Sequence, residues 1–368
     1  MSSRSDKYVI EPARPEDGQE LLRILEQMPY PGRVSLTYTR RPDAYRSFYK
    51  EGEEVRLFVC RDRRAGRIAG LGATAIRDVY INGDPRRVAY LFGLKVAPDY
   101  RGRFPLLPDC YAYLYDYLQK KDVEVTFTTI LSGNDDARQL LEKKRSVMPA
   151  YEAFGRYETY ALRNRPAADA ASGRRIRAAG KDDIPALVRF LNREAQKHNF
   201  FPVSRARDWT GILDNGLTIA DVFVMEEGEE IIAAGAVWDQ SAYKQYVVNS
   251  YSGGLKLLAA LPWVSRLCGL PPLPAPGETV RFYTLGRWAV RDNDVRIFDS
   301  FLDQVMQAAA DYPLCLVGVH EGHPLRERLQ RRRHVRYDSE VYLVNWESKT
   351  SPVNDLKPLT VYLECGAL

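Results

Sequence analysis

LKVAPDYRGRFPLL, residues Leu94 to Leu107, is the part of the sequence that says most about the fold. Its first residues read as the end of a strand, and Leu107 begins a run with apolar residues on one helical face. A short basic turn with Arg101 and Arg103 joins the two elements. The first amides of a helix have no partners within the helix, and the helix dipole adds positive charge there. The turn is therefore expected to bind an anion such as a diphosphate.

The sequence around this turn predicts a sheet covered by helices. Strands are expected at 55–60, 67–80, 88–96 and 123–131, and helices at 106–119 and 135–144. The first of these helices places Leu107, Cys110, Leu114 and Leu118 on one face. That face can cover a sheet. An alternating, aromatic strand at 157–162 closes this part of the chain.

The start of the chain is repeated later in the sequence. IEPARPEDGQELLRIL at 10–25 can be laid over IRAAGKDDIPALVRFL at 176–191, with Ile, Ala, Asp, Leu, Arg and Leu recurring at a constant offset. Both copies read as a strand, a turn and a helix entered through acidic residues, which suit the positive end of the helix. A period this long indicates a duplicated domain.

The second copy is expected to follow the same order. Its strands are predicted at 221–225, 230–238, 282–290 and 314–319, its long helix carries Phe298, Phe301 and Val305 on one face, and 339–344 closes it. A polar run rich in Pro, Ala and Gly has no periodicity and predicts a linker. We therefore assign residues 1–163 to one domain, 164–174 to the linker and 175–368 to a second domain with an insertion at 243–278. The insertion could pack between the domains, line an acceptor pocket or touch a membrane, and packing is the conservative choice.

Composition and charge indicate an ordinary globular protein. The 368 residues exceed what one core usually organises, and 45% of them are apolar and 27% charged. A net charge of +5 is too small for this length to imply nucleic-acid binding. The cysteines form no CxxC pair, the N-terminus lacks a signal sequence, and no apolar run reaches the length of about 20 residues that a membrane span needs. We expect a cytoplasmic protein without a membrane span.

A resemblance to a known family lies in Val96-Ala-Pro-Asp-Tyr-Arg-Gly-Arg103, which is similar to the acetyl-CoA pyrophosphate loop of the GNAT superfamily of N-acyltransferases. The resemblance implies an α/β (α+β) fold of two tandem GNAT-like domains, each a mixed, mostly antiparallel sheet flanked by helices. It also implies a donor, acetyl-CoA or another acyl-CoA. The residues expected to bind this donor are Leu94, Lys95, Val96, Arg101, Gly102, Arg103, Phe104 and Leu106. The sequence departs from the family pattern where two small residues are replaced by Phe104 and Leu106.

The same resemblance implies further site residues. Asn134 matches the family's asparagine beside the pantetheine arm, although it also suits the N-cap of a helix. The position of the family's general-acid tyrosine is Leu141 here, so Tyr151 and Tyr157 are the candidate catalytic acids. The strand before the loop contains no carboxylate. A water chain or a carboxylate from elsewhere would have to accept the proton of an amine nucleophile.

These features predict a transferase that moves an acyl group, acetyl as first choice, from acyl-CoA to a small-molecule or peptide amine. Residues 288–296 lack the Arg-Gly-Arg arrangement, so the second copy is expected to be degenerate. Two alternatives remain open. The protein could be a catalytically inactive binding or regulatory module, or an acyltransferase for longer acyl chains with Phe104 and the insertion shaping the tunnel. His320 and His323 have no third ligand nearby, so no metal is expected.

Overall fold

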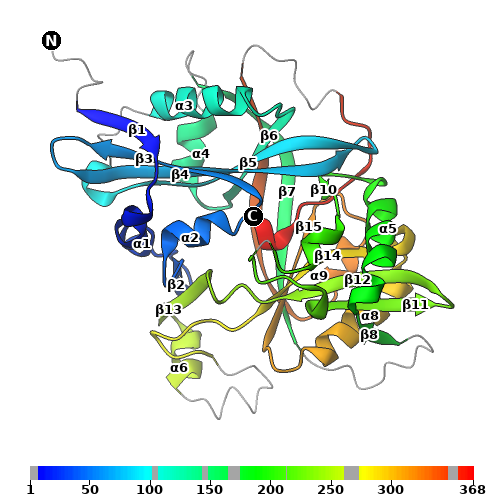
Figure 1. The fold of residues 1–368 in the computed structure, drawn as a ribbon. Coiled ribbons are helices and arrows are strands. Elements are labelled where there is room, and N and C mark those ends of the chain that lie inside the picture. The colour runs from blue at the N-terminus through cyan, green and yellow to red at the C-terminus, as the bar shows by residue number, and fades with distance from the viewer. Residues whose placement is uncertain are drawn as a thin grey trace.

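A computed structural model describes residues 7–101, 107–142, 148–164, 175–212, 214–260, 273–346 and 355–368. Its centre is one 13-stranded sheet in the order β1-β3-β4-β5-β6-β16-β7-β15-β14-β12-β11-β8, with β10 (Phe201–Pro202) paired beside β4 (Figure 1). Within the described part of this sheet the parallel pairs are β5 with β6 and β14 with β15. The predicted mixed, mostly antiparallel architecture is confirmed.

The first half places helices on both faces of its strands. The strands are β1 (Tyr8–Pro12), β3 (Glu54–Asp62), β4 (Arg67–Ile81), β5 (Asp84–Val96) and β6 (Val125–Leu131); the helices are α1 (Gly18–Glu26), α2 (Ala44–Tyr49), α3 (Leu107–Gln119) and α4 (Asp135–Glu142). Helix α3 buries the predicted face, which packs with Phe58 of β3 in one cluster. Helices α1 and α2 pack with Leu57 and Val59 in another. Because neighbouring strand residues point to opposite sides, α3 covers one face and α1 and α2 cover the other.

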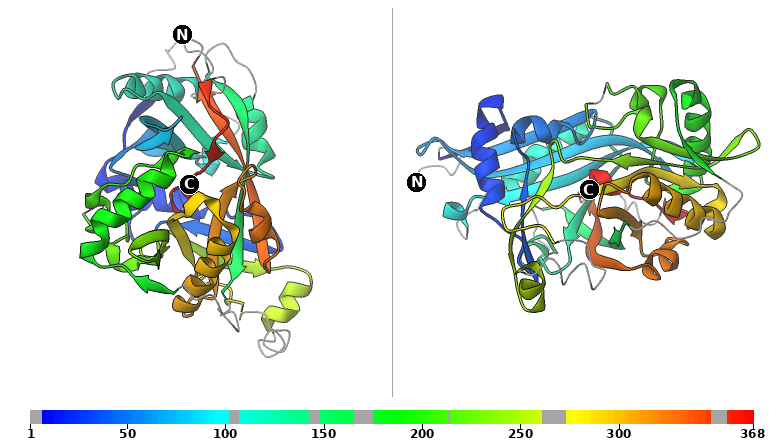
Figure 2. Two further views of the ribbon diagram at one scale, coloured as in Figure 1. Left: turned by 90° about the vertical axis from the view of Figure 1, so that its right-hand side faces the viewer. Right: turned by 90° about the horizontal axis from the view of Figure 1, so that it is seen from below.

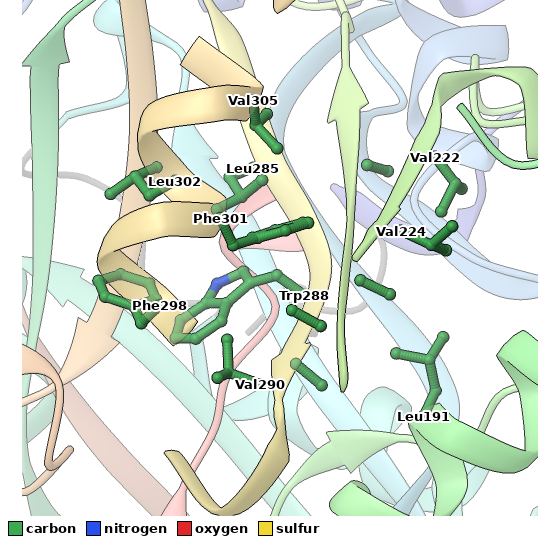
Figure 3. Packing of buried hydrophobic residues seen from close by; sticks show 14 of the residues in the cluster. Leu191, Val222, Val224, Leu285, Trp288, Val290, Phe298, Phe301, Leu302 and Val305 are labelled. Carbon is green, nitrogen blue, oxygen red and sulfur yellow. The ribbon is translucent and has the colours of Figure 1, made fainter. Parts of the chain in front are cut away.

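The second half repeats this plan. Its strands are β8 (Ile176–Ala178), β11 (Val222–Glu227), β12 (Glu230–Trp238), β14 (Tyr283–Val290) and β15 (Leu314–His320); its helices are α5 (Ile184–Ala195), α8 (Val295–Ala308) and α9 (Arg326–Gln330). Figure 3 shows Phe298 and Phe301 of α8 beside Trp288 of β14. The Trp288 and Phe298 ring centroids are 5.4 Å apart. In the view from below, α1 and α2 lie at one end of the molecule and α5 and α8 at the other (Figure 2).

The two closing strands differ from the expectation that each closes its own half. β7 (Ala150–Arg163) pairs with β15 of the second half, and β16 (His334–Asn345) pairs with β6 of the first. β7 and β16 also pair with each other, in the middle of the molecule (Figure 1). Alternating aromatic residues predict a half-buried strand but do not specify its partner. The strand exchange therefore joins both halves into one sheet.

A second connection between the halves runs through the insertion, where packing between the domains was the conservative expectation but a strand pairing was not predicted. β2 (Val34–Thr39) pairs with β13 (Gln245–Tyr251), which belongs to the insertion at 243–278. The insertion also contains α6 (Gly254–Ala260). Its described part thus packs between the halves. β9 (His198–Asn199) pairs with β17 (Thr360–Val361) near the end of the chain.

The predicted linker at 164–174 falls almost entirely outside the described residues, so the domain boundary stays a prediction. In the described ranges, every helix is too short or too polar to cross a bilayer.

Candidate active site

Strands β5 and β6 separate at the carboxyl end of their parallel pairing. They pair from Val88 and Val125 only as far as Leu91 and Thr128. Hydrogen bonds of two side chains lie at the end of the paired region. The Thr128 hydroxyl donates to the Leu91 carbonyl at 2.8 Å, and the Tyr90 hydroxyl lies 2.8 Å from the hydroxyl of Thr129. Beyond this point β6 continues along β16 on its other side. A gap therefore opens between the ends of β5 and β6.

A β-bulge in β5 lies beside this gap. Phe92 faces Ala73 and Lys95 faces Leu71, so Gly93 and Leu94 lie opposite a single residue of β4. Gly93 has a φ of +66°, a left-handed conformation that glycine adopts without strain. A Cβ at Gly93 would also lie 2.9 Å from the Phe48 ring. Glycine is required here by both conformation and space.

Cations without carboxylate partners follow the bulge. The Lys95 ammonium lies 5.3 Å from the centroid of the Tyr30 ring. Burial and the nearby Arg101 lower the pKa of Lys95. In the described ranges neither Lys95 nor Arg101 forms an ion pair. Val96 ends β5 opposite Gly70. Among the described residues, two cations that form no ion pair thus follow the bulge of β5.

The remaining residues predicted to bind the cofactor are placed only in part. Leu94 is 39% exposed at the bulge. Gly102, Arg103, Phe104 and Leu106 lie outside the described residues. Asn134 caps α4, because its side-chain oxygen accepts from the amide of Ala137 at 3.3 Å. Asn134 is exposed and lies in the turn after β6. Its contact with pantetheine stays a prediction.

The two candidate tyrosines do not come together. A register shift beside Gly155, which has a φ of +95°, separates them along β7. Tyr151 forms a hydrogen bond with the hydroxyl of Tyr111 on α3. Tyr157 donates to the Leu363 carbonyl at 3.0 Å. Burial raises the pKa of both well above the usual value, so both stay protonated at neutral pH. Their catalytic role stays a prediction.

A buried charge cluster that the sequence did not reveal lies between the halves. Glu51 forms ion pairs with Arg40 and, at 3.0 Å, with Lys244 of the second half. Burial alone would raise the pKa of Glu51, but these two cations hold it below its usual value. Arg77 adds a third cation and donates to the Glu51 carbonyl at 3.2 Å. Residues this far apart in the chain have no spacing pattern that could have predicted the cluster.

Comparison with known proteins gives a result only at the level of structure. No family model and no curated sequence matches the chain. A GCN5-related N-acetyltransferase from Anabaena variabilis is 12% identical, with 92% of this chain and 72% of that chain covered and a TM-score of 0.53. The N-myristoyltransferase of Saccharomyces cerevisiae, solved with bound myristoyl-CoA, is 9% identical, with 97% and 85% covered and a TM-score of 0.61. The chain has the GNAT fold. The predicted family resemblance is thereby confirmed at the level of fold.

The second GNAT copy has its own separation of strands and its own bulge. β14 and β15 pair only at Tyr283 and Thr284 before they separate. Arg287 and Trp288 lie opposite Gly235 alone. Arg287 has a φ of +50°, so this bulge has the same left-handed first residue as the one in β5. The two copies thus share a separation of parallel strands beside a bulge that begins with a left-handed residue.

The loop after β14 differs from the loop after β5. Asp294 precedes α8, and its carboxylate accepts from the amides of Arg296 at 2.8 Å and Ile297 at 3.0 Å. A carboxylate therefore occupies the start of this helix, where a GNAT copy that binds CoA would place the diphosphate. Like charges repel, so the Asp294 carboxylate disfavours a phosphate group at this helix start.

Proposed function

We propose that the chain is an acyltransferase that moves an acyl group from an acyl-CoA to an amine, with the donor in the cleft of the first half. The separation of β5 from β6 beside the Gly93 bulge carries the proposal. A gap between parallel strands would admit a narrow pantetheine arm, and Lys95 and Arg101 would neutralise the phosphates of the donor. Gly102, Arg103, Phe104 and Leu106 would continue the phosphate site, and Asn134 would contact the arm.

The chain's residues would act by orientation and by charge stabilisation. Backbone amides near Leu94 to Val96 would hold the thioester carbonyl while the amine attacks it. The new C–N bond forms, the C–S bond breaks, and the proton lost by the amine balances the departing thiolate. Support for the amide role comes from the second copy, where the amide of Arg287, the equivalent of Gly93 directly before this stretch, donates to the Glu364 carboxylate at 2.7 Å. An amide at this bulge therefore favours a negatively charged oxygen.

The acyl group is proposed to be acetyl, and the acceptor a small-molecule or peptide amine. The likeness to an N-myristoyltransferase makes a longer acyl chain the second candidate. Thiol release should be measured with acetyl-, octanoyl- and palmitoyl-CoA against a panel of amines and peptides. Turnover that is fastest with acetyl-CoA supports the first proposal, and a preference for palmitoyl-CoA supports the second. Binding of CoA with no turnover on any acceptor would instead identify an inactive binding or regulatory protein.

A further inference from the structure

The segment Tyr362–Ala367 lies beside the strands that separate in the second GNAT copy. Its 3-10 turn, η9 (Cys365–Ala367), contacts both β14 and β15, the strands that separate there. Tyr362 packs on Phe201 with ring centroids 4.2 Å apart. Glu364 is 5% exposed. A buried carboxylate is costly unless hydrogen bonds satisfy it, so the partners of Glu364 decide what the segment does.

Those partners are one backbone amide at the bulge of β14, which a bound ligand could use instead, and two groups of the segment itself. One carboxylate oxygen of Glu364 accepts from the Arg287 amide at 2.7 Å and from the Tyr362 hydroxyl at 3.1 Å. The other accepts from the amide of Gly366 at 3.3 Å. Arg287 is a left-handed residue that is not glycine, a conformation that persists only where the surroundings impose it. The hydrogen bond to Glu364 is one of the contacts that impose this conformation on Arg287.

Both anion positions of the second cleft are therefore filled by the chain itself. Asp294 takes the helix start that would face a diphosphate, and Glu364 takes the bulge amide that would face a thioester oxygen. We propose that Tyr362–Ala367 is an internal occupant of the second donor cleft, and that Glu364 is a positioning residue for acyl transfer in the first half. The second part rests on the function proposed above; the first part does not.

A contiguous set of contacts links the segment to the first cleft. The Gly366 carbonyl accepts from the Lys244 ammonium at 3.0 Å, and the Ala367 carbonyl accepts from Arg77 at 2.6 Å. The Arg77 guanidinium lies 5.3 Å from the centroid of the Tyr90 ring. Tyr90 is the residue whose hydroxyl meets β6 where β5 and β6 separate. Displacing Glu364 would move these carbonyls and loosen the support of the first cleft.

Occupancy of the second cleft is tested without any ligand by hydrogen exchange on the full chain. In Glu364→Ala, amides at 283–290 and 360–367 should exchange about tenfold faster or more, while 84–88 of β5 changes little. Glu229→Gln, at an exposed turn of the same half, is the control and should match the wild type. If Glu364→Ala folds poorly, Tyr362→Phe removes one donor to Glu364 and should shift exchange in the same direction. Unchanged exchange in both variants would overturn the proposal.

The positioning role is tested by steady-state kinetics with the best acyl-CoA. Glu364→Ala should lower kcat about tenfold while the KM for acyl-CoA changes less than about threefold, because the donor lies in the other copy. Glu364→Gln keeps an oxygen for the Arg287 amide and should recover most of kcat. An equal loss in Gln and Ala, or a loss confined to KM, would overturn the positioning role. If the wild type has no turnover, the proposed function fails, and the exchange experiment still decides occupancy.

Discussion

Gly93 and Arg287 are equivalent residues of the two GNAT copies, each the left-handed first residue of a bulge that lies opposite a single glycine. Their surroundings differ. The Arg287 amide is bonded to the chain's own Glu364, whereas Gly93 borders the gap between β5 and β6. The two halves thus share a left-handed bulge beside separating parallel strands, and only the bulge of the second half is hydrogen-bonded to a carboxylate of the segment Tyr362–Ala367 in the described residues.

Replacing Gly93 by Ala should weaken both the fold and donor binding. The left-handed φ costs alanine about 1 kcal/mol, and the clash with Phe48 adds more, so about 2–3 kcal/mol of unfolding free energy is expected to be lost. Gly66→Ala is the matched control, because Gly66 has a φ of +64° but no atom lies within 4 Å of the position that its Cβ would take. Urea unfolding measures the free energy of unfolding of Gly93→Ala and of Gly66→Ala. Equal losses at the two positions would contradict the steric requirement at the bulge.

Glu51 should be far more important for stability than its near neighbour Glu53. Glu51→Ala leaves the buried Arg40 and Lys244 without their carboxylate, which typically costs roughly 3–5 kcal/mol. Glu53 is exposed, and Arg207 is its one ion-pair partner among the described residues. Its replacement by Ala should cost less than about 1 kcal/mol. Thermal or urea unfolding compares them, and similar effects would show that the charge cluster does not hold the halves together.

Acid should destabilise the protein through Glu158, where β7 meets both β15 and β16. Burial alone would raise the pKa of Glu158, but hydrogen bonds from Arg326 and Tyr160 lower it from 4.5 to about 2. Since the folded pKa lies below the unfolded one, this stabilisation is complete above about pH 5 and is lost as the pH falls toward 2. After screening by solvent it should amount to about 1–3 kcal/mol at pH 7.

Urea unfolding of the wild type and Glu158→Gln at pH 7 and pH 3 measures this contribution. The wild type should be more stable at pH 7, and the difference should shrink at pH 3. Glu321→Gln, which removes an exposed partner of Arg156, should show little difference at either pH. If the difference in unfolding free energy between the wild type and Glu158→Gln were the same at pH 7 and pH 3, titration of Glu158 would be ruled out as its cause.

Local periodicity was sufficient to predict most elements but not their partners. The predicted strand at 230–238 coincides with β12, and the predicted strand at 282–290 begins one residue before β14. These strands are read from residues within one element, where alternation and turn signals are local. The exchange of β7 and β16 depends on which strand each one meets in space, and both sequences alternate in the same way.

In the candidate site too, residues in a local sequence pattern were predicted, whereas contacts between distant residues were not. Arg101 was predicted because a strand, a basic turn and a helix are adjacent in sequence, and Lys95 because the family resemblance implied it. Glu364 was not, although a single acidic residue within the apolar run at 360–368 is a signal of a buried carboxylate with a specific partner. That partner, the amide of Arg287, is a backbone group, and no side-chain motif identifies it.

A single acyl-CoA site in the first half can be tested by calorimetric titration of acetyl-CoA into five samples: the wild type, Arg101→Ala with Arg103→Ala, Arg291→Ala with Arg296→Ala, and both the wild type and the first pair at high salt. We expect one site per chain. The first pair should bind several-fold to a few hundred-fold more weakly, with a smaller loss at high salt, since each charge-assisted hydrogen bond contributes about 1.5–3 kcal/mol and screening reduces it. The second pair should bind like the wild type. Two sites per chain, or a loss of affinity only with the second pair, would be incompatible with one donor site in the first half.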